Sequence, residues 1–190
     1  MTQPIIKKIG KNRVFQYSTS GDLLMPEQIL SSWSAVSFSF PNGDDDSTNK
    51  GFRTAQLGAI YAIKAHWTVS SAPATIVMPT GTGKTETIIA AILSERRKKT
   101  CIVVPSQLLR NQTIEKCGLL YVLRNIGAVP SDYMNPSIGC LTTTPSTINE
   151  LLELITTSNI IVSTASLLSR FDKNYSEYLS NKCDTSQIRR

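Results

Sequence analysis

Lys84 and Thr85 are the residues whose types and spacing most clearly predict chemistry in this sequence. Two glycines, Gly81 and Gly83, precede them, and glycine lets a backbone curl so that several N–H groups point at one anion. The lysine adds a positive charge, and the threonine adds a hydroxyl that can bind Mg²⁺. A helix that begins here would add unpaired N–H groups and the positive end of its dipole. The stretch 78–85 therefore predicts a P-loop that binds a nucleoside triphosphate, which we take to be ATP.

One position departs from the general P-loop pattern, G-x-x-x-x-G-K-[ST]. Met78 stands where the first glycine is expected, whereas Pro79 to Thr85 follows a more specific version of the pattern. A chance glycine-rich turn is the alternative. We do not favour it, because the pattern predicts a buried strand before the loop and a helix after it.

Strands and helices are predicted to alternate from residue 53 onward. Hydrophobic periodicity predicts helices at 53–67, 84–98, 106–123 and 147–155, and another from about 165. Short apolar runs predict strands at 74–78, 101–104, 138–141 and 159–163. This alternation predicts an α/β fold in which helices cover both faces of a parallel sheet.

Residues 1–50 are less regular. Alternation predicts strands at 13–17 and 34–40, and the polar, turn-rich residues 41–50 predict a linker. The acidic triplet at 44–46 has the composition of a metal site, but we interpret it as a solvated loop, because adjacent carboxylates need a fold to converge them.

Composition excludes several protein classes. A hydrophobic content of 41% with 18% charged residues is typical of globular chains. The net charge of +6 fits a polyanionic partner, and it fits a basic protein without one equally well. The basic run 96–99 is interpreted as a complement to the dipole of the helix 84–98, in preference to a nucleic-acid patch. No apolar run approaches the length of a membrane span, so no membrane partner is expected.

Four cysteines lack the C-x-x-C spacing of zinc sites, and the sequence has one histidine. Cys101 and Cys117 are therefore expected to be small core residues. A reducing, cytoplasmic setting fits this use of cysteine.

The P-loop and its flanks resemble superfamily 2 helicases and translocases. Phe52 to Gln56 resembles that family's arginine-x-x-glutamine motif, whose glutamine reads the adenine edge with an amide that is both donor and acceptor. The resemblance implies that Lys84 and Thr85 are catalytic and that Thr85 binds Mg²⁺. It implies an ATP site made of Phe52, Arg53, Gln56, Pro79, Thr80, Gly81, Thr82, Gly83, Lys84, Thr85 and Glu86.

Two further stretches resemble motifs that contact a nucleic-acid backbone. Residues 101–112 are similar to motif Ia, and residues 160–168 are similar to a later threonine motif. A strand-to-helix turn offers N–H groups and a hydroxyl to phosphate without reading bases. The resemblance implies nucleic-acid contacts, with DNA before RNA, at Pro105, Ser106, Gln107, Arg110, Thr164 and Ser166.

The resemblance covers roughly residues 52–170. It is closest to the N-terminal helicase domain of type III restriction subunits and related DEAD/DEAH-box proteins, because of residues 62–67 and the Met-Pro-Thr start of the loop. It implies a RecA-like ATPase that uses ATP and Mg²⁺ in a restriction or defence system. We expect residues 1–50 to be a lead-in and linker, and residues 51–190 to be part of the RecA-like domain.

The main departure from this family is the absence of its acidic motif. Motor ATPases hold Mg²⁺ with a carboxylate that follows an apolar strand, and the 190 residues contain no Asp-Glu pair. We therefore expect a domain that ends before its Walker B motif and is incomplete, without turnover at a motor's rate. The sequence does not distinguish an experimental fragment, a disrupted gene product and a separately encoded piece with the remainder of the motor in another chain. A non-catalytic nucleotide-binding or assembly module that needs a partner chain is the alternative. A small-metabolite kinase is not favoured, because no arginine-rich lid follows the P-loop.

Overall fold

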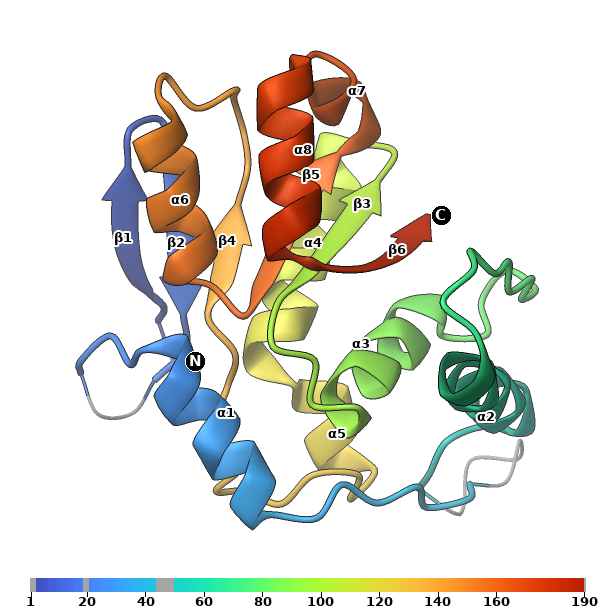
Figure 1. Ribbon diagram of the computed structural model, residues 1–190. Helices are drawn as coiled ribbons and strands as arrows, with labels where there is room; N and C mark the ends of the chain where they lie inside the picture. Colours follow the sequence, from blue (N-terminus) through green and yellow to red (C-terminus); the bar gives the residue numbers. More distant parts are fainter. Residues whose placement is uncertain (1–2, 19–20, 44–49, 190) are drawn as a thin grey trace. The chain divides into compact units, whose positions relative to one another are not determined.

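The computed structural model describes residues 3–18, 21–43 and 50–189, and it divides into two compact units (Figure 1). The first unit comprises residues 1–32, 97–119 and 134–190, and it contains the β-sheet. The second comprises residues 33–96 and 120–133, and it contains the P-loop. Each unit is described by itself.

The first unit is built on a six-stranded sheet. Its strands, in spatial order, are β1 (Ile5–Ile9), β2 (Asn12–Gln16), β4 (Ile138–Cys140), β5 (Ile160–Thr164), β3 (Thr100–Val104) and β6 (Asp184–Arg189). The four strands from β4 to β6 are parallel, which confirms the predicted parallel α/β sheet. β2 confirms the predicted strand 13–17, but its hairpin with β1 was not expected. This hairpin extends the sheet with antiparallel pairing to β4. Gly10, with φ +57°, supplies the left-handed residue of its tight turn.

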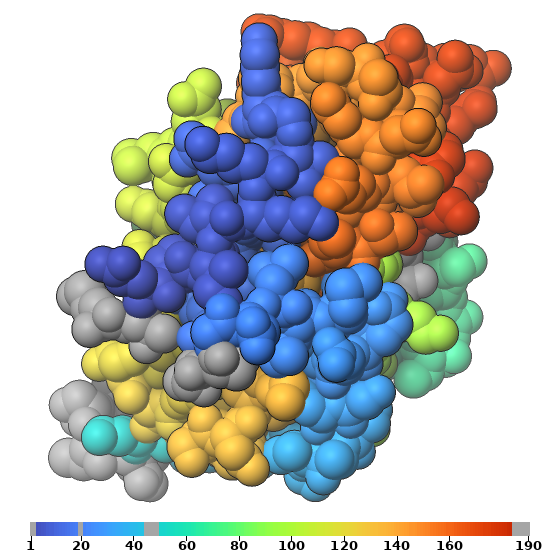
Figure 2. Space-filling model, turned by 90° about the vertical axis from the view of Figure 1, so that its left-hand side faces the viewer, coloured from blue at the N-terminus to red at the C-terminus, as the bar shows by residue number. Residues whose placement is uncertain are grey.

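Helices cover both faces of this sheet, as predicted. Figure 1 shows α6 (Ile148–Thr156) and α8 (Lys173–Lys182) on one face and α4 (Gln107–Leu119) on the other. The short α7 (Ala165–Leu168) follows β5 directly. Buried residues of the strands and of the helices α6 and α8 form one core cluster, which includes Val14, Leu141, Leu151, Leu154, Ile161 and Leu179. In Figure 2 the hairpin lies beside α6, where Lys7 Nζ is 2.9 Å from Glu153 Oε1.

The second unit is helical in its described residues. Its helices are α2 (Thr54–Val69), α3 (Lys84–Ser94) and α5 (Tyr121–Asn125), and α2 packs on α3. Trp33 stacks on Tyr133 with ring centroids 5.7 Å apart. Lys64 pairs with Glu95, which ties α2 to the end of α3. The P-loop is therefore supported by a packed helix pair.

The predicted strand 34–40 is wrong. Residues 26–35 form the helix α1 (Pro26–Ala35), and residues 36–40 have no regular structure. Ile29 and Trp33 lie one helical turn apart, and both are fully buried. Apolar residues spaced by one turn favour a helix, and here they determine the structure more than the alternation at 34–40, which favours a strand. Pro26 suits the first position of a helix.

The predicted buried strand 74–78 is also wrong. These residues form no strand, and Ile76 and Val77 are 41% and 88% exposed, although Met78 is buried. A β-strand needs the backbone of a neighbour to pair with, and apolar, β-branched sequence alone does not supply that neighbour.

Two helix predictions had wrong ends. α3 ends at Ser94 and Arg96 has φ +49°, so the basic run 96–99 does not lie on the last turn of a helix. Instead, Lys99 Nζ donates to the carbonyl oxygens of Thr156 at 3.2 Å and Ser158 at 2.8 Å, at the C-terminal end of α6. The predicted helix 106–123 is divided into α4 and α5 by Leu120, whose φ is +50°.

The predicted helix start at Thr147 and the predicted burial of Cys101 and Cys117 were confirmed. Thr147 is the N-cap of α6, and its hydroxyl accepts from Glu150 N at 3.2 Å. All four cysteines are buried and none is part of a disulfide, including Cys101 and Cys117. No helix in the described part is long and apolar enough to cross a membrane. Most of the predicted linker 41–50, with its acidic triplet, lies outside the described residues.

Candidate nucleotide and nucleic-acid sites

The P-loop has the backbone shape that its glycines predict. Gly81 and Gly83 have φ values of +82° and +81°, a region that residues with a side chain rarely adopt. Gly83 is the N-cap of α3, so Lys84 and Thr85 are the first residues of that helix. No atom lies within 4 Å of the place where a Cβ on Gly81 would be, so the loop is open there. The positive end of the α3 dipole and this open loop suit an anion.

Side-chain contacts close the loop on itself. Thr82 Oγ1 donates to Pro79 O at 2.7 Å, and Thr87 Oγ1 donates to Gly83 O at 3.1 Å. Pro79 and Thr80 are exposed, whereas Lys84, Thr85 and Glu86 are half-buried. The loop is therefore held by its own hydroxyls and remains open to solvent.

Arg53, the N-cap of α2, and Gln56, in its first turn, hold the loop from outside. Arg53 Nη1 donates to Gly81 O at 3.0 Å, and Gln56 Nε2 donates to Gly83 O at 3.3 Å. Gln56 Oε1 also accepts from Arg53 N at 3.0 Å, so the two side chains are linked. Both residues were predicted to contact nucleotide, but their contacts with the loop carbonyls were not. Sequence spacing could not reveal these contacts, because 25 or more residues separate the partners.

Gln56 keeps part of its hydrogen-bonding capacity despite these contacts. An amide has two N–H donors and two acceptor lone pairs, and one of each is used here. The side chain is 8% exposed, so a base could reach it only at its remaining open edge. Phe52 is fully buried; its backbone pairs with Pro41 O and Gly43 N, and its ring lies 6.2 Å from that of Phe40. Phe52 therefore anchors the start of α2.

The predicted nucleic-acid residues lie in the first unit, where two strand ends bring most of them together. β3 and β5 are parallel neighbours, and Val104 is the register partner of Thr164. Pro105 and Ser106 therefore leave the sheet beside Thr164 and Ser166. Pro105, Ser106, Gln107 and Ser166 are exposed. The carboxyl edge of the sheet thus presents a polar surface formed by both motifs.

Two of the three hydroxyls of this edge, those of Ser106 and Thr164, cap helices. Ser106 Oγ accepts from Leu109 N at 3.3 Å at the start of α4, and Thr164 Oγ1 accepts from Leu167 N at 3.3 Å at the start of α7. A hydroxyl that accepts one bond still has a proton to donate. Thr164 is buried and lies 3.3 Å from Ser166 Oγ, so Ser106 and Ser166 are the better placed to meet a phosphate.

Arg110 differs from these exposed residues because its side chain is buried. Its side chain is 7% exposed, and Nη1 donates to Leu141 O at 3.2 Å, after the end of β4. Its Nε is buried and has no acceptor in the described residues. The structure thus places the side chain of this predicted contact in the lining of a pocket of the first unit.

Comparison with known families agrees with the P-loop and the α/β sheet. The family described as type III restriction enzyme, res subunit, matches residues 49–188. Neither the curated proteins nor the solved structures yield a match to this chain. The match covers most of the chain, and the hairpin of β1 and β2 lies outside it.

Proposed function

This chain belongs to the family of type III restriction enzyme res subunits, an ATP-dependent helicase-like family, and we propose that it is the ATP-binding portion of a nucleic-acid helicase or translocase in a restriction or defence system. The observation that supports it best is the P-loop itself, in which two glycines have positive φ and α2 holds their carbonyl groups. A loop fixed before binding needs little ordering when the phosphates arrive.

Each P-loop residue has a role in this proposal. The N–H groups at the start of α3 bind phosphate oxygens, and Lys84 neutralises the β- and γ-phosphates. Thr85 offers one hydroxyl oxygen to Mg²⁺, an oxygen-seeking ion that keeps several waters and phosphate ligands. No cluster of three His, Cys, Asp or Glu side chains in the described residues could hold a metal, so phosphate and Thr85 would be its main partners. Gln56 would bind the adenine edge with its remaining donor and acceptor.

The polar edge at the ends of β3 and β5 is the proposed nucleic-acid contact. Ser106 and Ser166 would donate to phosphate, together with backbone N–H groups of the two turns. Such contacts position a strand without reading its bases, as a translocating motor requires. The family's restriction role favours DNA over RNA. The four free cysteines fit a cytoplasmic setting.

A second candidate is a nucleotide-binding module that does not hydrolyse ATP alone. The absence of any Asp-Glu pair in the 190 residues favours it. In related NTPases an arginine supplied by a partner raises the rate about 10³–10⁵-fold, so a module that needs a partner chain should hydrolyse ATP slowly by itself.

Phosphate release separates the two candidates. It is measured with single-stranded and duplex DNA and RNA, for the wild-type chain and for Lys84→Ala. We expect ATP binding that DNA alters, because coupling between two ligands is reciprocal, with little turnover. Nucleic-acid-stimulated turnover that Lys84→Ala abolishes would support the helicase or translocase and contradict the module that does not hydrolyse ATP alone. ATP binding that neither DNA nor RNA changes would favour the module.

A further inference from the structure

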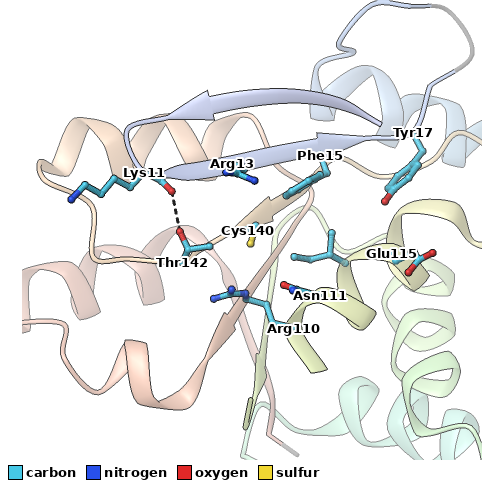
Figure 3. A pocket seen from close by; sticks show the side chains of 10 residues that line it. Lys11, Arg13, Phe15, Tyr17, Arg110, Asn111, Glu115, Cys140 and Thr142 are labelled. Atoms are coloured by element: carbon cyan, nitrogen blue, oxygen red, sulfur yellow. Dashed lines mark hydrogen bonds between the residues drawn. The ribbon is translucent and has the colours of Figure 1, made fainter. Parts of the chain in front are cut away.

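A pocket of about 440 Å³ lies in the first unit between the hairpin, α4 and the end of β4 (Figure 3). This volume is within the range of small-ligand sites, about 300–1,000 Å³. Its lining residues are Lys11, Arg13, Phe15, Tyr17, Arg110, Asn111, Ile114, Glu115, Cys140 and Thr142. None belongs to the P-loop. Four of them come from the hairpin, outside the part of the chain that matches the family.

Positive charge in this pocket exceeds negative charge. Lys11, Arg13 and Arg110 are cations, Glu115 is the one carboxylate in the lining, and no ion pair joins these cations to an acid in the described residues. Arg13 is the register partner of Cys140. Burial raises the pKa of the Cys140 thiol, while the guanidinium groups of Arg110 and Arg13 act in the opposite direction. Two guanidinium groups therefore lie near one point, an arrangement that suits a phosphate.

The guanidinium group of Arg110 is buried and held in a fixed position in the pocket. One terminal nitrogen is fixed on Leu141 O, and the opposite edge of the guanidinium includes the buried Nε that has no acceptor. A buried donor without an acceptor is unfavourable, and an anion that reached it would satisfy it. The planar guanidinium can bind phosphate through two parallel N–H groups, after a small movement of the neighbouring side chains.

Two aromatic rings form the other half of the pocket. Phe15 and Tyr17 both come from the β2 side of the hairpin (Figure 3). A Cβ on Gly118 of α4 would lie 2.3 Å from the Tyr17 ring, so the ring sits directly on that glycine. Asn135 Nδ2 donates to Tyr17 O at 2.7 Å and holds its backbone. The ring is thus positioned before any ligand arrives.

The turn end of the hairpin is also tied down. Asn12 Oδ1 accepts from Thr142 N at 2.8 Å and from Thr143 N at 3.1 Å. Thr142 Oγ1 donates to Lys11 O at 3.0 Å, the bond drawn in Figure 3. Contacts at both ends therefore fix the hairpin wall against β4 and α4.

We propose that this pocket binds one phosphorylated nucleoside, with the phosphate on Arg13 and Arg110 and the base on Phe15 and Tyr17. Base stacking on aromatic rings beside cations is a common way to hold single-stranded nucleic acid. Glu115 lies close enough to Tyr17 for its carboxylate to raise the pKa of the phenol, in addition to the larger effect of burial. A carboxylate there accepts from the exocyclic amine of cytosine. The nucleoside belongs either to a strand or to a free nucleotide, and the strand form rests on the proposed function.

Fluorescence anisotropy of a labelled single-stranded oligodeoxycytidylate tests the pocket, with cytidine monophosphate as competitor. Arg13→Ala and Tyr17→Leu should each weaken binding about fivefold or more. Arg13→Ala should also reduce the slope of log affinity against log salt concentration by about one, because one fewer counterion is released. Glu115→Gln should reduce the ratio of the affinity for oligodeoxycytidylate to that for oligothymidylate, because thymine has no exocyclic amine. Lys182→Ala removes an equal charge from an exposed site on α8 and should change little.

The outcomes distinguish a free nucleotide from a nucleic-acid strand, and they test this pocket separately from the proposed ATP site. Competition by cytidine monophosphate that depends on Arg13 and Tyr17 assigns the pocket to a mononucleotide. Strand binding with the same dependence and no competition assigns it to a strand. Binding of both ligands that is indifferent to Arg13→Ala and Tyr17→Leu overturns the proposal. Lys84→Ala should leave this pocket unaffected, and Arg13→Ala should leave binding of a fluorescent ATP analogue unaffected, so either proposal can fail alone.

Discussion

Gly83→Ala should impair ATP binding through Gln56 as well as through the backbone. Gly83 has φ +81° and ψ +40°, and a left-handed conformation costs a residue with a side chain about 1–2 kcal/mol. The added Cβ would also lie 2.3 Å from Gln56 Nε2, so the Gln56 side chain must move. That movement breaks its bonds to Gly83 O and Arg53 N, each worth about 1 kcal/mol.

Gly81→Ala is the matched control. Gly81 has nearly the same φ, +82°, but nothing lies within 4 Å of its would-be Cβ. Gly81→Ala should therefore lose only the free energy that the left-handed backbone conformation costs a residue with a side chain. The two variants should differ by about 2 kcal/mol, or roughly 30-fold in affinity for a fluorescent ATP analogue, because a loop that rarely adopts the binding conformation binds proportionately more weakly.

A double-mutant cycle isolates the contact. Gln56→Ala should cost affinity in the wild-type chain, but little or nothing in the Gly83→Ala chain, where the same bonds are already broken and the clash is relieved. The effects of Gln56→Ala and Gly81→Ala should add. Equal affinities for Gly81→Ala and Gly83→Ala, together with additivity in both cycles, would refute the view that Gln56 supports the loop.

Three further predictions concern stability and reactivity. Lys99→Met removes two bonds to the end of α6 and should lower the free energy of unfolding by about 1–3 kcal/mol in urea titrations, whereas Lys98→Met should not. Burial lowers the pKa of Lys99, so just below pH 10.5 the unfolded chain binds more protons than the folded chain. The free energy of unfolding of the wild-type chain should therefore increase as the pH rises through that window, and Lys99→Met should remove this increase. Thr147→Ala removes the N-cap of α6 and should cost about 1 kcal/mol by the same assay, with the exposed Thr144→Ala as a neutral control; equal effects would contradict the capping role. Burial, with a smaller effect of a neighbouring thiol, raises the pKa of Cys101 to about 12, so it and the other buried cysteines should react with a thiol reagent slowly at pH 8 until the chain is unfolded; rapid labelling of the native chain would contradict their burial.

Local sequence predicted the elements whose determinants are local. The glycine pair and Lys84 predicted the loop and the start of α3, and Thr147 predicted the start of α6. Apolar runs predicted β3, β4 and β5, because these strands are buried on both faces and have little polar alternation. The parallel sheet followed from the order of these elements.

Features that depend on distant partners could not be predicted in this way. Residues 74–78 have strand composition but no paired neighbour here, and Lys99 serves a helix end more than 50 residues away. The hairpin's place beside β4 depends on Asn12 and on the turn after β4, which are 130 residues apart. Arg110 was predicted as a phosphate contact, and only the structure joins it with Arg13 and Tyr17 in one pocket.

The most direct test of the ATP site is the affinity for a fluorescent ATP analogue with Mg²⁺, measured for the wild-type chain, Lys84→Ala and Lys98→Ala. Lys98 is an exposed lysine outside the P-loop, so its replacement removes the same charge without touching the loop. We predict saturable binding by the wild-type chain and by Lys98→Ala, and binding by Lys84→Ala that is at least about tenfold weaker, as loss of a charge-assisted bond to phosphate implies. Equal affinity in all three proteins, or no saturable binding by the wild-type chain, would contradict the assignment of the ATP site.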